Sequence, residues 1–371
     1  MVKFAITKLH TLENILMEKD KKIKLGISIG DLNGIGSEII LKTFEDIRML
    51  EFCTPVIFGS VKTMSFFKKH FESSINFHGI NHTDEILDGK VNIVNVWKEN
   101  VNINFGDEDL KIGEYSIKSL EAATNALKDN GIDVLVTAPI HKHNIQSDSF
   151  KFPGHTNYLA EKLGGKSLMF MITDTLKVGL LTDHVPVKDV SSQITTELIN
   201  EKINTVYKSL VEDFGIRKPK IAVLGINPHA GDNGVIGEED DAVLRPTLEA
   251  IKDKMVYGPY SADSFFGSSN YKNFDAIIAS YHDQGLIPFK TITFGHGVNY
   301  TAGLSKVRTS PDHGTAFEIA GKGEADNGSF KEAVFKAIEI FNSREEYKEY
   351  AKNPLRKAPK RLEKPTRPRD K

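Results

Sequence analysis

The chain of 371 residues contains one cysteine, Cys53, and one tryptophan. A single cysteine excludes an internal disulfide and is typical of a protein in a reducing compartment. No apolar run approaches the ~20 residues that a membrane-spanning helix needs. The first 22 residues also lack the apolar core and the small-residue cleavage site of a signal peptide. We therefore expect a cytoplasmic protein that has no membrane partner.

A strong charge of one sign is missing too. The formal net charge is −2, from 48 Lys and Arg against 50 Asp and Glu. Nothing in this balance indicates a nucleic-acid partner. Hydrophobic residues make up 40% of the chain and charged residues 26%, which is ordinary for a globular protein. The length favours two domains of ordinary size.

The familiar nucleotide and metal motifs are absent as contiguous patterns. There is no H-E-x-x-H, and the loop GDLNGIG at residues 30–36 has glycines at 30, 34 and 36. That spacing matches neither G-x-G-x-x-G nor a Walker A loop. Two interpretations stay open: a tight turn from strand to helix, or a ligand loop that presents a helix N-terminus to an anion.

The central part of the chain alternates apolar strand patterns with helical patterns. This alternation predicts an α/β fold with a largely parallel sheet or sheets. Gly131 follows one helical pattern closely enough to serve as its cap. The predicted strands are 24–30, 54–60, 132–140, 177–182, 221–225 and 274–279, and the predicted helices are 37–47, 61–71, 116–130, 195–213, 238–254 and 329–342.

Both ends differ from the middle. Residues 1–22 do not continue the alternation, and Met17 would make a natural start, so we expect a disordered N-terminal extension. Residues 351–371 are expected to be a basic tail, because the last 17 residues carry eight Lys or Arg against two acidic residues and three prolines. Neither segment has the apolar surface to offset the entropy of ordering it.

Three histidines follow three of the predicted strands: His184 in TDH, His229 in NPH and His282 in YHD. A single histidine at such a place is more often a hydrogen-bonded loop residue than a ligand. Three in equivalent positions, where the ends of parallel strands gather, favour a site for a divalent transition metal with open coordination positions.

Two further groups are candidates for binding an anion. His155 and Thr156 lie side by side in a glycine turn, where they could hold phosphate or where Thr156 could cap a helix. Lys290, Asn299 and Arg308 suit a phosphorylated, carboxylated substrate, or are ordinary surface residues.

The motifs together resemble the 4-hydroxythreonine-4-phosphate dehydrogenase family of pyridoxal 5′-phosphate biosynthesis. The resemblance covers about residues 24–345, in a fixed order. It rests on GDLNGIGSEI, VTAPIHK, FPGHTNYLAE, LLTDHVPVKDV, INPHAGDNGVIGEEDD, GPYSADSFF, YHDQGLIPFK, VNYTAGL and RTSPDHGTAFEIAGKG. The last motif is also similar to the adenine-side NAD loop of isopropylmalate and isocitrate dehydrogenases.

The resemblance implies a fold of two α/β/α domains around a cleft. The first domain is expected over 23–140 plus 306–350, and the second, with the metal and dimer contacts, over 141–305. It also implies a homodimer with a shared active site, in which one metal-binding histidine comes from the partner. By its place in the sequence, His282 is predicted to be that histidine.

Residue by residue, the resemblance implies a site for a phosphorylated substrate, NAD in preference to NADP, and a divalent metal (Zn, Co or Mg). The metal ligands would be His184, His229 and His282, and the substrate contacts His155, Thr156, Lys290, Asn299 and Arg308. Candidates for the catalytic base are Asp283, His155 and a metal-bound water. The cofactor contacts would be Asp312, His313, Gly314, Thr315, Ala320 and Gly321.

The implied reaction is the oxidation of 4-phosphooxy-L-threonine to 2-amino-3-oxo-4-phosphooxybutanoate, which decarboxylates to 3-amino-2-oxopropyl phosphate. Two alternatives stay open. One is a dehydrogenase of a related four-carbon acid phosphate, such as threonate or erythronate 4-phosphate, because Lys306 and Glu318 depart from the family pattern. The other is a metal-dependent hydrolase of a phosphorylated metabolite, since three histidines would equally serve water activation.

Overall fold

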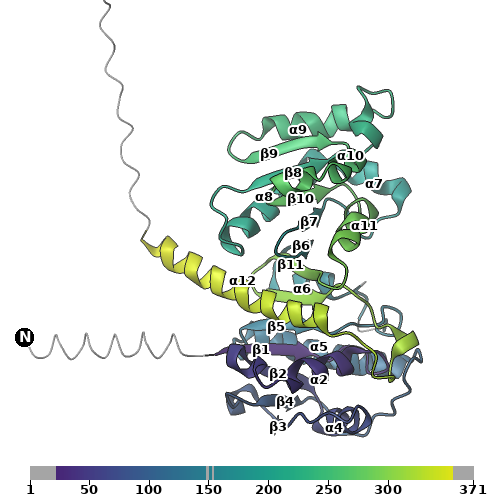
Figure 1. The fold of residues 1–371 in the computed structure, drawn as a ribbon, viewed down its shortest axis with the longest axis vertical. Coiled ribbons are helices and arrows are strands. Elements are labelled where there is room, and N and C mark those ends of the chain that lie inside the picture. Colours follow the sequence, from purple (N-terminus) through teal and green to yellow (C-terminus); the bar gives the residue numbers. More distant parts are fainter. Residues whose placement is uncertain (1–21, 148–149, 153, 354–371) are drawn as a thin grey trace, which may run out of the picture.

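A computed structural model describes residues 22–147, 150–152 and 154–353. The expectations for residues 1–21 and 354–371 lie outside the described residues. One mixed sheet runs through the molecule from the lower to the upper half of Figure 1, in the order β3-β4-β2-β1-β5-β12-β11-β6-β7-β10-β8-β9. The expected α/β fold is confirmed. The two-domain boundaries stay a prediction, and the sheet is continuous across them.

The strands of the sheet are β1 (Ile23–Ser28), β2 (Cys53–Gly59), β3 (Phe77–Ile80), β4 (Val91–Asn95), β5 (Val134–Thr137), β6 (Gly165–Ile172), β7 (Lys177–Leu180), β8 (Lys220–Leu224), β9 (Met255–Tyr260), β10 (Ala276–Ala279), β11 (Val298–Leu304) and β12 (Val307–Pro311). Both ends of the sheet are parallel, as predicted. In the middle, β11 is antiparallel to both β12 and β6, and β6 is antiparallel to β7. This antiparallel centre was not predicted, and it is where the two halves of the molecule join.

The main helices are α2 (Gly36–Glu45), α4 (Val61–His70), α5 (Leu110–Lys128), α6 (His155–Leu163), α8 (Thr196–Glu212), α9 (Arg245–Ala250), α10 (Ala262–Gly267), α11 (His282–Thr293) and α12 (Gly328–Lys352); α3 (Met49–Phe52) and α7 (Val190–Gln193) are single turns. The predicted helix 238–254 is instead a π-helical turn, Asp240–Leu244, followed by the short α9.

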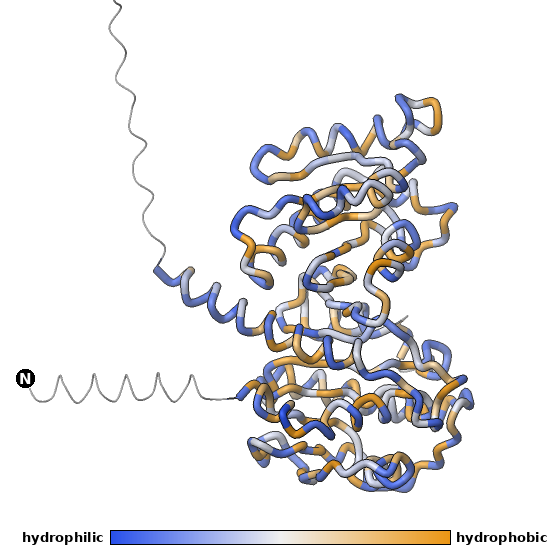
Figure 2. The backbone as a smooth tube through the Cα atoms, viewed as in Figure 1, coloured by the Kyte–Doolittle hydropathy of each residue, from blue (hydrophilic) through white to orange (hydrophobic). Residues whose placement is uncertain are grey.

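Helix α12 crosses the junction of the two halves and continues well past its predicted end at residue 342 (Figure 1). Figure 2 shows its outer end in hydrophilic blue, so the last turns lie in solvent rather than in the core. Helix-forming residues continue up to Asn353, and Pro354 is the first breaker in the sequence. Apolar periodicity therefore predicted only the part of this helix that packs against the sheet.

The turn that ends α5 differs from the prediction by one residue. Asn130 takes the left-handed conformation with φ 61°, and the Gly131 N–H donates to the Ala126 carbonyl at 2.8 Å. Asparagine tolerates this conformation better than most residues with a side chain. The C-cap itself is Asp129, and Asn130, which follows it, makes the turn one residue before the predicted Gly131.

The apolar core is continuous on one face of the sheet and divided on the other. On the first face α2, α4, α8 and α12 cover a single large cluster. On the second face, α5 and α6 cover one cluster over β2, β5 and β4, while α10 and α11 cover another over β6, β7, β8 and β10. Between these two clusters, a space stays open over the middle strands between the N-terminus of α6 and helix α11, and this is where a cavity forms.

A buried polar cluster ties α8, β11 and α12 together beneath this cavity. The Asp213 carboxylate accepts hydrogen bonds from the Ser209 hydroxyl at 2.5 Å, the Tyr300 hydroxyl at 2.6 Å and the Arg344 Nε at 2.5 Å. The Arg344 guanidinium also donates to the Tyr300 oxygen at 2.7 Å. Burial beside this carboxylate raises the pKa of Tyr300 well above its usual value.

We predict that Asp213→Ala lowers the free energy of unfolding by roughly 3–5 kcal/mol, because it leaves the buried Arg344 without its counter-charge. Urea unfolding followed by circular dichroism measures the change. Glu345→Ala, which breaks the exposed pair with Lys348 on the same helix, is the matched control and should cost no more than about 1 kcal/mol. Equal effects of the two variants would contradict the assigned role of Asp213.

Candidate functional site

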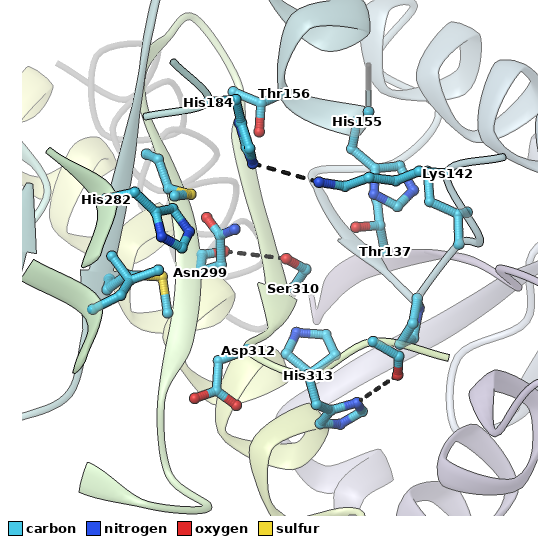
Figure 3. Close-up of a pocket in the computed structure, with 18 of the residues that line it drawn as sticks. Thr137, Lys142, His155, Thr156, His184, His282, Asn299, Ser310, Asp312 and His313 are labelled. Atoms are coloured by element: carbon cyan, nitrogen blue, oxygen red, sulfur yellow. Dashed lines mark hydrogen bonds between the residues drawn. The ribbon is translucent and has the colours of Figure 1, made fainter. Parts of the chain in front are cut away.

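A cavity of about 510 Å³ lies over the middle strands. Its lining comes from both halves of the molecule: the ends of β5 and β12, the N-terminus of α6, the strands β6 and β11, and helix α11. Figure 3 shows His184, Thr156 and Lys142 toward one end, and Asp312 and His313 toward the other. The predicted site residues that line it are His155, Thr156, His184, His282, Asp283, Lys290, Asn299, Arg308, Asp312, His313 and Gly314.

Arg308 is the buried charge of this cavity. It lies on β12 with only 2% of its surface exposed, so the alternative of an ordinary surface residue is wrong for it. Its guanidinium donates only to hydroxyls: Nε and Nη2 to Thr137 Oγ1 at 3.2 and 2.5 Å, and Nη1 to Thr301 Oγ1 at 3.1 Å. Among the described residues no carboxylate forms an ion pair with it, and burial lowers its pKa to about 9. An unpaired buried guanidinium that lines a cavity indicates an anionic ligand.

The first turn of α6 faces the same cavity. His155 and Thr156 are its first two residues, and Gly154 is the N-cap, so the alternative that Thr156 caps this helix is wrong. Burial, and then the charge of Arg308, lower the pKa of His155 well below its usual value. The imidazole is therefore neutral, and its buried Nε2 has no hydrogen-bond partner. Free N–H groups at a helix N-terminus beside a guanidinium favour a phosphate.

His184 and His282 lie next to each other across the cavity mouth, with ring centroids 5.9 Å apart. Each has an aspartate beside its Nδ1: Asp283 Oδ1 lies 2.7 Å from His282 Nδ1, and Asp183 Oδ2 lies 3.9 Å from His184 Nδ1. A carboxylate at Nδ1 favours the tautomer whose Nε2 carries the lone pair. Both histidines are thus suited to offer Nε2 to a metal ion.

His229 does not line the cavity. Within the described ranges, no group of three His, Cys, Asp or Glu side chains is close enough to hold a metal ion. His282 lies beside His184 in the same chain, so the prediction that His282 is the partner's contribution stays untested and is not the one that this arrangement favours. The histidine that lies apart is His229.

The loop that carries His229 is strained and firmly held. His229, Ala230 and Asp232 all have positive φ angles, of 54°, 52° and 45°, a conformation that costs residues with side chains about 1–3 kcal/mol each. The buried Asp240, on the π-helical turn, fixes the start of the loop by accepting from the Ile226 and Asn227 N–H groups at 2.8 and 2.9 Å. This loop therefore holds an exposed His229 outside the lining of its own chain's cavity.

Asn299 and Lys290 complete the polar lining. The Asn299 Oδ1 atom is buried and has no partner. Lys290 extends from α11 and donates to the Asp312 carbonyl at 2.8 Å. His155 Nε2 and Asn299 Oδ1 are thus two buried polar atoms without a partner among the described residues. A ligand that both donates and accepts hydrogen bonds would satisfy them.

The predicted cofactor loop is only partly at the cavity. Asp312, His313 and Gly314 line it, and the His313 Nε2 is buried and unpartnered. Thr315, Ala320 and Gly321 lie outside the lining. The loop 30–36 supports this segment from behind: the Ile35 N–H donates to the Thr315 carbonyl at 3.0 Å.

The loop 30–36 is itself buried. At Gly30, which has φ +73°, an added Cβ would come within 2.3 Å of the Pro139 carbonyl oxygen. Close packing between the ends of β1 and β5 thus explains this glycine, and the tight-turn interpretation is the correct one.

Several residues that line the cavity were not predicted as site residues. Thr137 was predicted only as part of the strand 132–140, and Met169 and Met171 lie on β6, which was not predicted. Lys142 stood inside the motif VTAPIHK, but nothing in a single lysine after a strand distinguishes it from a surface residue. Its Nζ lies 3.4 Å from His184 Nε2 (Figure 3), a contact that only the tertiary structure brings about.

A family model described as pyridoxal phosphate biosynthetic protein PdxA matches residues 51–337. The chain is 47% identical over 343 residues to a 4-hydroxythreonine-4-phosphate dehydrogenase of Bacteroides thetaiotaomicron, covering 91% of this chain and 94% of the relative. It is 34% identical to a D-threonate 4-phosphate dehydrogenase of Cupriavidus necator, with 86% and 98% covered. The crystal structure of a 4-hydroxythreonine-4-phosphate dehydrogenase from Burkholderia phymatum is similar with a TM-score of 0.72 and 32% identity, over 86% of this chain and 98% of that one.

We predict that Arg308→Met weakens anion binding without unfolding the protein. Replacing a buried unpaired charge by an apolar side chain of similar length removes a desolvation cost, so the melting temperature should be kept or raised. Affinity for inorganic phosphate should fall at least about tenfold, the value of one charged hydrogen bond. Calorimetric titration and thermal unfolding measure the two effects, and a large loss of stability would mean that Arg308 is a structural residue.

Proposed function

Because the chain belongs to the family of the pyridoxal phosphate biosynthetic protein PdxA, we propose that it is an NAD-dependent and divalent-metal-dependent 4-hydroxythreonine-4-phosphate dehydrogenase. It would oxidise the C3 hydroxyl of 4-phosphooxy-L-threonine. The product, 2-amino-3-oxo-4-phosphooxybutanoate, would then lose CO2 and gain a proton at C2 to give 3-amino-2-oxopropyl phosphate.

The observation that carries this proposal is the buried Arg308 without a carboxylate partner, beside the N-terminus of α6. A phosphate of charge near −2 would satisfy the guanidinium and the free N–H groups together. Thr156 and Lys290 would add hydrogen bonds at its edge. Binding energy from the phosphate, remote from the reacting carbon, would orient the C3 hydroxyl.

The donor set fits a transition metal better than magnesium. His184 and His282 offer imidazole nitrogens, whereas Asp283 is engaged with His282. Imidazole suits zinc or cobalt, while magnesium prefers oxygen ligands. When bound, the metal would supply a Lewis acid that lowers the pKa of the substrate hydroxyl. The third imidazole would be His229 of the partner subunit.

Two exposed apolar side chains lie on the segments that carry the proposed histidine ligands. Ile287 on α11, the helix that begins at His282, lines the cavity and is 63% exposed, and Val235, in the turn that follows His229, is 81% exposed. A two-fold dimer that buries both would bring each His229 to the other chain's cavity.

NAD would lie at the end of the cavity formed by Asp312, His313 and Gly314, and when bound it would accept the hydride from C3. The unpartnered His313 Nε2 supplies a hydrogen bond there. Thr315, Ala320 and Gly321 do not line the cavity. They would instead fix the backbone conformation of the loop that contacts the cofactor. Asp283, His155 and a metal-bound water stay the predicted candidates for accepting the hydroxyl proton. Of the two side chains, His155 is neutral and has a free nitrogen.

D-Threonate 4-phosphate is the competing substrate, since it shares the phosphate, the hydroxyl and the carboxylate. We favour 4-phosphooxy-L-threonine because the 47% identical relative carries that name, against 34% for the threonate enzyme. The cavity extends past the histidines to Asp312, His313 and Gly314. A hydrolase would not need this additional part of the cavity, whereas a dehydrogenase would need it for the cofactor.

The proposal predicts metal-dependent formation of reduced nicotinamide, measured by absorbance, with 4-phosphooxy-L-threonine as the better substrate. NAD should give a higher kcat/KM than NADP, and chelation should abolish turnover until zinc or cobalt is restored. Faster reaction with D-threonate 4-phosphate would reassign the substrate. Release of inorganic phosphate without nicotinamide reduction would instead indicate the hydrolase.

The shared site predicts complementation between inactive variants. Dimers that combine one His184→Ala chain with one His229→Ala chain contain one intact site, so an equal mixture after subunit exchange should recover about a quarter of the wild-type activity. Mixing His184→Ala with His282→Ala is the matched control, because both histidines belong to the same chain's cavity and no intact site can form. Recovery in the control but not in the first mixture would show that His282 crosses the interface instead.

A further inference from the structure

Among the described residues that line the cavity, Lys142 is the cation that the proposed reaction does not yet use. It follows β5 in a tight turn, residues 142–145, and lines the cavity from the half opposite His184. The turn is anchored from below: the side chain of the buried Asn144 donates to Asp31 Oδ2 at 3.1 Å. At Gly113 an added Cβ would come within 1.8 Å of the Asn144 carbonyl oxygen. The backbone of Lys142 is therefore held in place by buried contacts.

The ammonium group of Lys142 has an unusual partner. Its Nζ lies 3.4 Å from His184 Nε2, and among the described residues no carboxylate forms an ion pair with it. An ammonium has three N–H donors and no lone pair, so in this contact the histidine nitrogen must be the acceptor. That nitrogen is the one that the Asp183–His184 pair leaves free for a metal ion.

We propose that Lys142 couples the binding of the metal to the binding of the anionic substrate. The inference rests on the proposed function and adds a residue to it. Without ligands, Lys142 occupies the lone pair of His184 and places a positive charge at the metal position. A divalent cation must displace the ammonium group, and the two positive charges then lie close together. Because they repel each other, Lys142 weakens metal binding when no substrate is bound.

The substrate reverses this effect. Once the metal holds His184 Nε2, the displaced ammonium lies at the same end of the cavity and has no counter-charge. An anionic group of the substrate satisfies it and removes its repulsion toward the metal. Metal and substrate therefore each raise the affinity for the other by the same factor, as linkage requires.

The test measures metal affinity by competition with a chromophoric chelator, using zinc and the full-length dimer without NAD so that no turnover occurs. Wild type, Lys142→Met and Lys142→Arg are each titrated with and without 4-phosphooxy-L-threonine. Lys128→Met removes the same charge from the exposed last turn of α5, far from the cavity lining, and is the matched control.

We expect Lys142→Met to bind zinc about tenfold more tightly than wild type in the absence of substrate, within the usual range of coupling between sites. The substrate should raise the zinc affinity of wild type. It should raise the zinc affinity of Lys142→Arg by a smaller factor, because this variant keeps the charge, and should hardly change that of Lys142→Met. Lys128→Met should behave as wild type.

The comparison without substrate does not depend on which substrate is correct. Equal zinc affinity of wild type and Lys142→Met, or weaker binding by the variant, would overturn the role of Lys142 while leaving the proposed function intact. An undiminished substrate effect in Lys142→Met would overturn the coupling. Absence of zinc binding in every protein would count against the metal of the proposed function itself, and the coupling would fall with it.

Discussion

The burial of one uncompensated guanidinium is the constraint on which the site depends. Arg308 lies on β12 at the centre of the sheet, and within the described part of the chain its guanidinium donates only to the hydroxyls of Thr137 and Thr301. A charge in this position is costly unless a ligand completes it. The fold accommodates it because the helices of one face stop on either side of the middle strands, so the apolar core is divided where the charge lies. The same division leaves the space that a substrate needs.

The antiparallel centre of the sheet gives this arrangement its geometry. The antiparallel β11 and β6 lie where the two halves join, and side chains of both halves line one space: Arg308 from β12, Asn299 from β11, and His184 and His282 from beyond β7 and β10. The polar cluster of Asp213, Tyr300 and Arg344 fixes β11 against α8 and α12 on the other face. The cavity thus lies on one face of the sheet, and the polar cluster stabilises the same strands on the opposite face.

Histidine orientation follows a second simple rule. Asp183 and Asp283 are sequence neighbours of the two histidines, and each lies on the Nδ1 side of its ring. Both Nε2 atoms are consequently left for a ligand, and in this structure one of them faces Lys142. His229 stands in a strained, well-anchored loop that faces outward. In each chain, two of the three proposed metal ligands, His184 and His282, therefore lie together, and the third, His229, lies apart.

The sequence by itself determined the α/β alternation, because apolar runs and helical periodicity are local properties. It also identified most of the polar side chains that line the cavity, since His155, Thr156, Lys290 and Asn299 stand in recognisable motifs. It could not decide that Arg308 is buried, that β11 and β6 pair antiparallel, or that Asn130 rather than Gly131 makes the turn after α5. Only the tertiary structure decided that His282 joins His184 while His229 lies apart, and that Lys142 reaches His184 from the opposite half. Distances between segments more than 40 residues apart depend on how the sheet is assembled, and no local pattern encodes them.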